Sequence, residues 1–150
     1  MPHQSITEQD LAALIERVST AAQAYISGDM DTYFSLIHHA DDFTLMSPFG
    51  GEPERGFDTS PAHIADLKRY FRGGAAEVEV AQTYVSGDLA VLVVIERQRG
   101  EVGGLPEQDW SLRVTWVFRR TASDWEQVHR HADALVHPIS MDQLSALARG

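Results

Sequence analysis

The sequence contains no cysteine, and this absence excludes disulfide bonds, thiolate catalysis and zinc sites built from cysteine. Basic residues are scarce, because 12 lysines and arginines face 22 aspartates and glutamates and leave a formal net charge of -10. A field of this sign repels phosphate backbones and anionic lipid headgroups. The composition therefore predicts neither a nucleic-acid-binding protein nor a protein that associates with membranes.

Long apolar runs and targeting segments are also missing. The longest strongly apolar run extends from Leu89 to Ile95, far short of the roughly 20 residues that a transmembrane helix needs. The first five residues lack the basic and apolar segments of a secretory signal peptide. We therefore expect a cytoplasmic protein. A chain of 150 residues is typical of one domain, which we expect to span 1–150.

The first half of the chain has the apolar spacing of amphipathic helices. In residues 7–26 apolar side chains recur every three or four positions, Ser5 and Glu8 have capping-box spacing, and Gly28 is placed to end the helix. The other elements expected here are a helix over 29–39, a strand over 43–47, a loop over 47–59 and a helix from Ser60-Pro61 to Gly73-Gly74.

After Gly74 the apolar spacing changes to every second residue, which is the period of a half-buried strand. Short turn sequences between neighbouring strands predict antiparallel hairpins. Helices followed by a run of strands indicate an α+β fold in which the helices pack on the concave face of a curved antiparallel sheet. Four strands are expected, over 78–85, 89–98, 110–119 and 125–132, and a short C-terminal helix over 140–149 that docks through Leu144 and Leu147.

Several segments, taken in order, match a known family pattern. They are Tyr33-Phe34, the run 87–90, Arg119-Arg120 and, most strongly, the run Trp-Glu-Gln-Val-His-Arg-His-Ala-Asp at 125–133. In these residues the chain resembles the nuclear transport factor 2-like superfamily, and within it the SnoaL-like proteins and the association domain of calcium/calmodulin-dependent kinase II. The similarity covers the expected domain core, residues 7–133.

The resemblance implies a cone-shaped, cystatin-like α+β domain, usually dimeric, with a pocket between helices and sheet. It does not imply one function, because the superfamily includes isomerases, cyclases, dehydratases, ligand binders and oligomerisation modules. The function has to be argued from the side chains that face the pocket.

Alternation along the strands predicts which side chains these are. On the last strand Gln127, His129 and His131 share one face, and Arg130 lies on the other. We place the large apolar residues Trp116 and Phe118 on the outer face of the sheet, in a homodimer interface. The residues expected to point into the pocket are Glu96, Arg113, Thr115, His129 and His131, joined by Tyr33 and Trp110.

These residue types are suited to proton transfer. Burial lowers the pKa of histidine, and a neutral imidazole can take a proton from a substrate while Arg113 stabilises the anion and Tyr33 donates a hydrogen bond. Ketosteroid isomerase, a member of the same superfamily, works on this principle. Its catalytic positions do not match this sequence one by one, so no catalytic residue is assigned. No cofactor is expected.

The two histidines of the last strand have other possible roles. His129 and His131 could orient neighbouring strands through hydrogen bonds, or they could bind a metal ion. A third metal ligand would have to come from His38, His39, Asp133 or Glu96, and no second spacing motif supports such a site, so none is predicted. His38 and His39 are expected at a helix end, where a cation suits the helix dipole.

The remaining pocket residues also have structural alternatives. Glu96 and Arg113 could form an ion pair, Tyr33 could pack in the core, and Asp109-Trp110 could be a turn followed by an anchoring aromatic residue. Two functions therefore stay open. The first is a binding domain whose pocket takes a small, partly apolar ligand, and the second is an acid–base enzyme of the polyketide cyclase or ketosteroid isomerase type.

Overall fold

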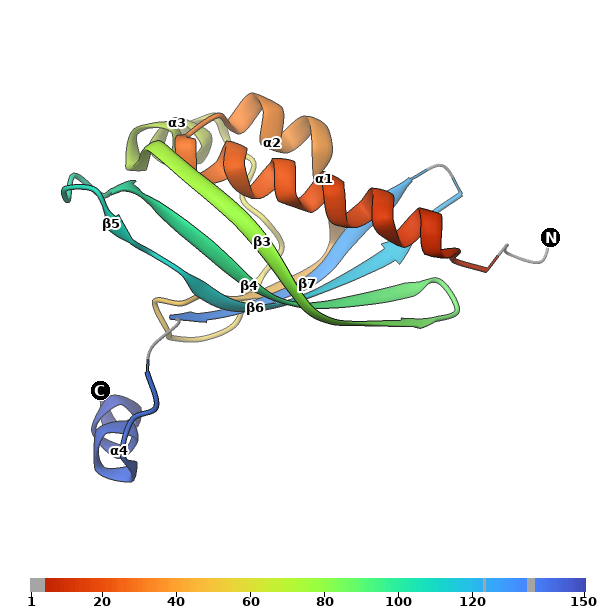
Figure 1. The fold of residues 1–150 in the computed structure, drawn as a ribbon. Helices are drawn as coiled ribbons and strands as arrows, with labels where there is room; N and C mark the ends of the chain where they lie inside the picture. Colours follow the sequence, from red (N-terminus) through yellow and green to blue (C-terminus); the bar gives the residue numbers. More distant parts are fainter. Residues whose placement is uncertain (1–4, 123, 135–136) are drawn as a thin grey trace.

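The computed structural model describes residues 5–122, 124–134 and 137–150. The N-terminal helices lie on one side of a curved sheet, and the C-terminal helix stands apart from it (Figure 1). The helices are α1 (Glu8–Ser27), α2 (Met30–Leu36), α3 (Pro61–Tyr70) and α4 (Met141–Arg149). The strands in the described residues are β1 (His39–Met46), β2 (Glu54–Arg55), β3 (Phe71–Ser86), β4 (Leu89–Val102), β5 (Gln108–Asp109), β6 (Leu112–Arg120) and β7 (Trp125–Ala134).

The strands form one sheet in the order β2-β1-β7-β6-β4-β3, and β5 pairs with β4. β1 and β7 are parallel, whereas the other neighbouring pairs are antiparallel. This arrangement confirms the predicted α+β class, with the N-terminal helices packed on the inner face of a curled sheet. β3 begins directly after α3, so Gly73 and Gly74 lie inside a strand and do not end the helix as expected.

Both ends of α1 are fixed by local interactions. The Thr7 side chain accepts a hydrogen bond from the Asp10 N–H (3.0 Å), and the Asp10 carboxylate accepts one from the Thr7 N–H (2.9 Å). The predicted capping box at Ser5 and Glu8 is therefore wrong by two residues. Gly28 ends the helix as predicted, with φ at 81°, and a Cβ there would lie 2.2 Å from the Phe71 carbonyl oxygen. Only glycine lets α1 end this close to β3.

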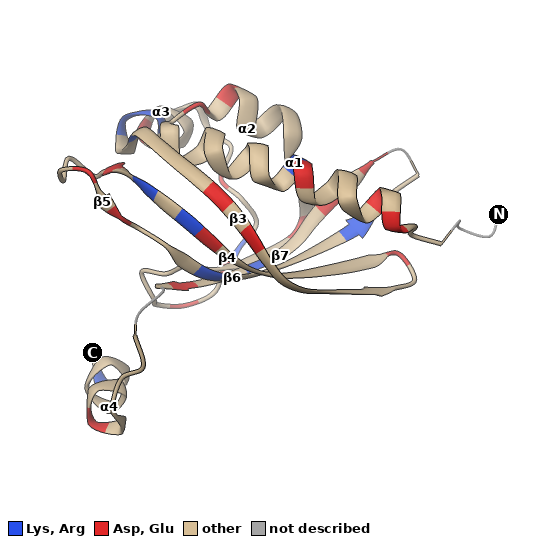
Figure 2. Ribbon diagram, viewed as in Figure 1, with Lys and Arg blue, Asp and Glu red and all other residues tan. Residues whose placement is uncertain are grey.

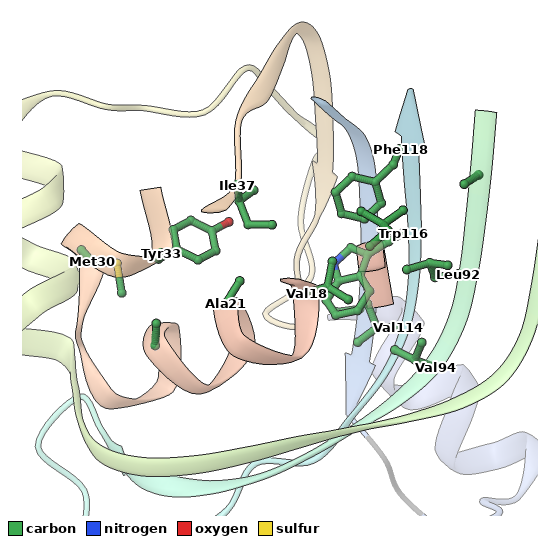
Figure 3. Close-up of a cluster of buried hydrophobic side chains, with 14 of the residues drawn as sticks. Val18, Ala21, Met30, Tyr33, Ile37, Leu92, Val94, Val114, Trp116 and Phe118 are labelled. Atoms are coloured by element: carbon green, nitrogen blue, oxygen red, sulfur yellow. The ribbon is translucent and has the colours of Figure 1, made fainter. Parts of the chain in front are cut away.

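The inner face of β6 carries large buried side chains. Trp116 and Phe118 are only 4% and 2% exposed, and they belong to the same apolar cluster as Val18 of α1 (Figure 3). The prediction that these two residues face outward is wrong, because the apolar faces of the helices need an apolar partner and find it within the same chain.

The C-terminal helix forms where expected but does not dock. Ser140 and Gln143 make its capping box. Leu144 and Leu147 are 59% and 73% exposed, and no residue of α4 is buried, so the predicted docking contact is wrong. Among the helices in the described part of the chain, none combines the length and apolar character that crossing a bilayer requires.

Candidate functional site

A cavity of about 1820 Å³ lies between the helices and the inner face of the sheet. It opens to solvent, and its volume exceeds the roughly 300–1,000 Å³ that is usual for small-molecule pockets. The loop between β1 and α3, which contains Phe49 and Phe57, forms part of its rim. Most of the wall is apolar, and its aromatic members include Tyr25, Tyr33, Phe43, Phe71, Trp110 and Trp116.

A bulge in β7 decides which of its side chains enter this cavity. Phe118 pairs with Gln127, but the next pair is Val117 with His129, so Val128 is an extra residue in the ladder. A bulge of this kind changes the alternation of faces. It turns both Gln127 and Arg130 to the inner face, and both line the cavity.

Two residues of the cavity wall, Glu96 of β4 and Arg130 of β7, form a largely buried ion pair. The Arg130 Nη2 donates to Glu96 Oε2 at 2.8 Å, and both side chains are largely buried. Acidic and basic residues follow one another along β4 (Figure 2), and alternation leaves Arg97 exposed while Glu96 faces inward. The guanidinium also lies 5.2 Å from the centre of the Trp116 ring, a distance suited to a cation–π contact.

The ion pair keeps Arg130 charged although it is buried. Burial alone lowers the pKa of a guanidinium, because it removes water from the charged form. The neighbouring Glu96 carboxylate outweighs this effect and raises the pKa of Arg130. The buried part of the cavity wall at this pair therefore carries one positive and one negative charge that compensate each other.

A second polar pair lies on the wall formed by α2 and β1. The Tyr33 hydroxyl and His39 Nε2 are 3.1 Å apart, and the His39 ring stacks on Phe57 with 4.0 Å between centroids. Burial lowers the pKa of His39 to about 4, with a smaller contribution from the neighbouring His38. Burial also raises the pKa of Tyr33, so near neutral pH the pair consists of an uncharged imidazole and a protonated phenol.

The low pKa of His39 predicts a pH-dependent stability. The unfolded side chain binds a proton near pH 6.5 and the folded one near pH 4, so unfolding takes up a proton between these values. A group whose pKa is higher in the unfolded state stabilises that state as the pH falls. His39 therefore lowers the free energy of unfolding by about 1.4 kcal/mol for each unit by which the pH falls within this window. Urea denaturation at pH 7, 6, 5 and 4 should show a shallower fall for His39→Gln than for the wild type. Equal slopes would show that His39 is not held neutral.

Four of the predicted pocket residues lie on the opposite face of the sheet. Arg113, Thr115, His129 and His131 do not line the cavity, so their predicted inward orientation is wrong. On β6 they alternate with the apolar residues that the helices cover. On β7 the bulge places Gln127 on the inner face and the two histidines on the outer face, although alternation alone would put all three on one face.

On that outer face His129, His131 and Arg113 make ordinary surface contacts. His129 Nδ1 donates to the Thr44 carbonyl oxygen (3.1 Å), and His131 Nε2 lies 3.4 Å from Asp133 Oδ2. Arg113 and Asp133 form an exposed ion pair at 3.8 Å, and Glu96 does not take part in it. The alternative in which the histidines orient neighbouring strands thus fits the contacts of His129.

Of the candidate third metal ligands in the described residues, Asp133 lies beside His131, but no further ligand completes a site. His38 lies 3.5 Å from Asp124, and His39 enters the cavity as a neutral ring, so neither reaches the outer face. In the ranges that the structure describes, no group of three or more histidine, aspartate or glutamate residues is arranged to hold a metal ion. The expectation that His39 is a cation at a helix end is wrong, because α2 ends at Leu36 and His39 begins β1.

The structure does place Tyr33, Glu96 and Trp110 on the cavity wall. Trp110 is fixed there by a hydrogen bond from Nε1 to the Gly100 carbonyl oxygen (2.9 Å). That these three residues contact a ligand stays a prediction. Sequence reasoning missed Tyr25, His39, Gln127 and Arg130. Arg130 could not be found by alternation, because the hairpin register without the bulge would pair Trp116 with His129.

Comparison with known proteins agrees with this architecture. A family model described as a SnoaL-like domain matches residues 14–136. A nuclear transport factor 2-like protein from Salmonella enterica has a TM-score of 0.69 at 16% identity, over 89% of this chain and 94% of that chain. The CaMKII hub of S. rosetta has a TM-score of 0.62 at 18% identity, over 82% of this chain and 95% of that chain.

A third similar structure carries a provisional enzyme assignment. It is a dehydratase, provisionally assigned, of the nuclear transport factor 2-like family from Streptomyces avermitilis, with a TM-score of 0.62 at 22% identity, over 85% of this chain and 99% of that chain. A search of curated proteins finds no match. At these identities the structural similarities establish the fold and leave the chemistry to the residues of this chain.

Proposed function

This chain belongs to the SnoaL-like domain family, and we propose that its cavity binds a small, partly apolar molecule without net charge. The observation that carries the proposal is the combination of a large aromatic cavity with one buried ion pair in its wall. Ligand sites commonly join an apolar wall to a few polar groups that fix orientation. The wall supplies contact area, and the ion pair supplies one donor and one acceptor.

The ion pair also favours a neutral ligand. Arg130 is already neutralised by Glu96, so a ligand carboxylate would place two anions beside a single buried cation. Burying an uncompensated charge is costly in a site of low polarity. A carbonyl or hydroxyl group avoids this cost, because it accepts from Arg130 or donates to Glu96 without adding charge.

Removal of the ion pair tests this proposal. Calorimetric titration with neutral two-ring compounds such as 2-naphthol and 2-tetralone should show binding to the wild type and at least about tenfold weaker binding to Arg130→Met/Glu96→Gln. The matched control is Arg113→Met/Asp133→Asn, which removes an ion pair from the outer face and should bind as the wild type does. Absence of binding to the wild type, or equal effects of the two double variants, would overturn the proposal.

A second candidate function is acid–base catalysis on a carbonyl compound. It is supported by the neutral His39 ring bonded to the Tyr33 hydroxyl in the cavity wall, and by the similarity to the provisionally assigned dehydratase. A neutral imidazole can remove a proton from the carbon next to a carbonyl group. If so, the protein should accelerate exchange of the α-protons of 2-tetralone in D2O, and His39→Gln should abolish the effect while His129→Gln on the outer face should not. Exchange at the buffer rate would reject catalysis and leave ligand binding untouched.

Self-association through the outer face of the sheet is also part of the proposal. That face carries half-exposed Val91, Val93 and Val117 and the exposed Tyr84, and the similarity to a hub domain is consistent with assembly. Trp116 and Phe118 do not contribute, because they are buried under the helices. Sedimentation velocity should show a dimer that Val93→Glu converts to a monomer, and a monomeric wild type would reject this part.

A further inference from the structure

Gln127 has a buried hydrogen-bond acceptor that the described residues do not use. The residue is 3% exposed, and its amide oxygen has no hydrogen-bond partner among the described residues. Buried polar groups in folded proteins are nearly always paired, because an unpaired one loses its bond to water and gains nothing. Gln127 also lines the cavity, so a donor group that enters beside this residue and reaches the covered oxygen can supply the missing bond.

The main chain of Gln127 is held firmly in place. The Gln127 N–H donates to the His38 carbonyl oxygen (2.7 Å), which ties β7 to the start of β1. Gln127 is the register partner of His39 on one side and of Phe118 on the other. Because the bulge at Val128 brings Gln127 and Arg130 to the same face, both residues line the same cavity.

From this arrangement we propose that Gln127 accepts a hydrogen bond from a hydroxyl group of an aromatic ligand and so selects hydroxylated, phenol-like molecules. The inference rests on the proposed function, since it assigns a specificity-determining residue within the same cavity. The aromatic character of the ligand follows from the ring-lined wall, and its neutrality follows from the compensated charges of Glu96 and Arg130. An ammonium donor is disfavoured because it would be buried near the Arg130 guanidinium.

A pair of matched probes tests the role of the hydroxyl group. 2-Naphthol and 2-methoxynaphthalene have the same rings, but only the first can donate a hydrogen bond. Binding is measured by calorimetry, with quenching of the cavity tryptophans Trp110 and Trp116 as a second readout. The wild type should bind 2-naphthol about tenfold more tightly than the methyl ether, which is the discrimination expected when a buried acceptor is left unpaired.

The variant Gln127→Met removes the acceptor and keeps the length of the side chain. It should weaken 2-naphthol binding about tenfold, to the level of the methyl ether, and leave the binding of the ether unchanged. Because the wild-type oxygen is unpaired, the free variant should melt at the same temperature as the wild type or higher. Thr115→Val, on the outer face, serves as the control and should keep the full preference for the hydroxyl compound.

The outcomes separate this inference from the proposed function. If both probes bind the wild type equally, Gln127 does not select a hydroxyl group, while ligand binding itself stands. If the preference survives in Gln127→Met, the hydroxyl group is recognised elsewhere and the assignment to Gln127 is wrong. If neither probe binds the wild type, the proposed function fails and this inference fails with it.

Discussion

Arg130→Met is expected to destabilise the protein by about 3–5 kcal/mol at pH 7, because it leaves the Glu96 carboxylate buried without a partner. In the wild type the two side chains are joined at 2.8 Å and lie largely out of solvent. For a chain of this length the loss corresponds to a fall in melting temperature of roughly 10 °C. Urea denaturation followed by circular dichroism measures it directly.

Two further variants show whether the lost charge pairing is the cause. Arg130→Met/Glu96→Gln removes both charges at similar volume and should recover stability to within about 1 kcal/mol of the wild type. Arg113→Met breaks the ion pair between Arg113 and Asp133, whose side chains are 63% and 53% exposed. This change should lower the free energy of unfolding by less than about 1 kcal/mol. Equal losses in Arg130→Met and Arg113→Met would mean that the pair of the inner face is not buried in solution.

Trp116→Ala should have an effect of similar size for a different reason. The indole is 4% exposed and packs in the apolar cluster between α1 and the sheet, so its removal leaves a large void in the core. Truncation of a buried tryptophan or phenylalanine costs about 3–5 kcal/mol, and the same loss is expected for Phe118→Ala. Chemical denaturation of each variant gives the value.

The neighbouring residue Val117 provides the control, because it is partly exposed on the outer face. Val117→Ala should cost about 1 kcal/mol or less. If Trp116→Ala kept its stability but no longer formed dimers, the side chain would belong to an interface between copies, as the sequence pattern alone suggested.

Much of the fold could be predicted from local pattern. The apolar spacing of residues 7–26 and the stop at Gly28 depend on interactions within a few residues, and the structure confirms both. The change of period after Gly74 likewise predicted the run of long antiparallel strands. The parallel pairing of β1 with β7 joins segments more than 80 residues apart, and no local pattern in the sequence indicates it.

The residues of the site were harder to predict, because the prediction requires knowing which face of the sheet the helices cover. Alternation tells which residues share a face but not which face the helices cover. Placing Trp116 outward moved Arg113 and Thr115 into the pocket, and with them His129 and His131. The bulge at Val128 then broke the alternation on β7, and a single inserted residue of this kind leaves no mark in the apolar pattern.

Fewer errors of orientation arise for residues outside β6 and β7. Glu96 was placed correctly beside Leu92 and Val94, because β4 is a regular strand over this stretch and all three are buried on its inner face. His39 was missed because the predicted helix ran to residue 39, whereas α2 ends at Leu36. An error of three residues at a helix end thus moved one histidine from the surface into the cavity.

The proposed function requires that the ligand binds on the inner face of the sheet. Intermolecular nuclear Overhauser effects between 2-naphthol and the isotope-labelled protein test this most directly, because they report which protons lie within a few ångströms of the bound ring. We expect contacts to Tyr25, Phe71 and Trp116 of the cavity wall. Contacts confined to Thr115, Val117 and His129 would place the ligand on the outer face and contradict the account.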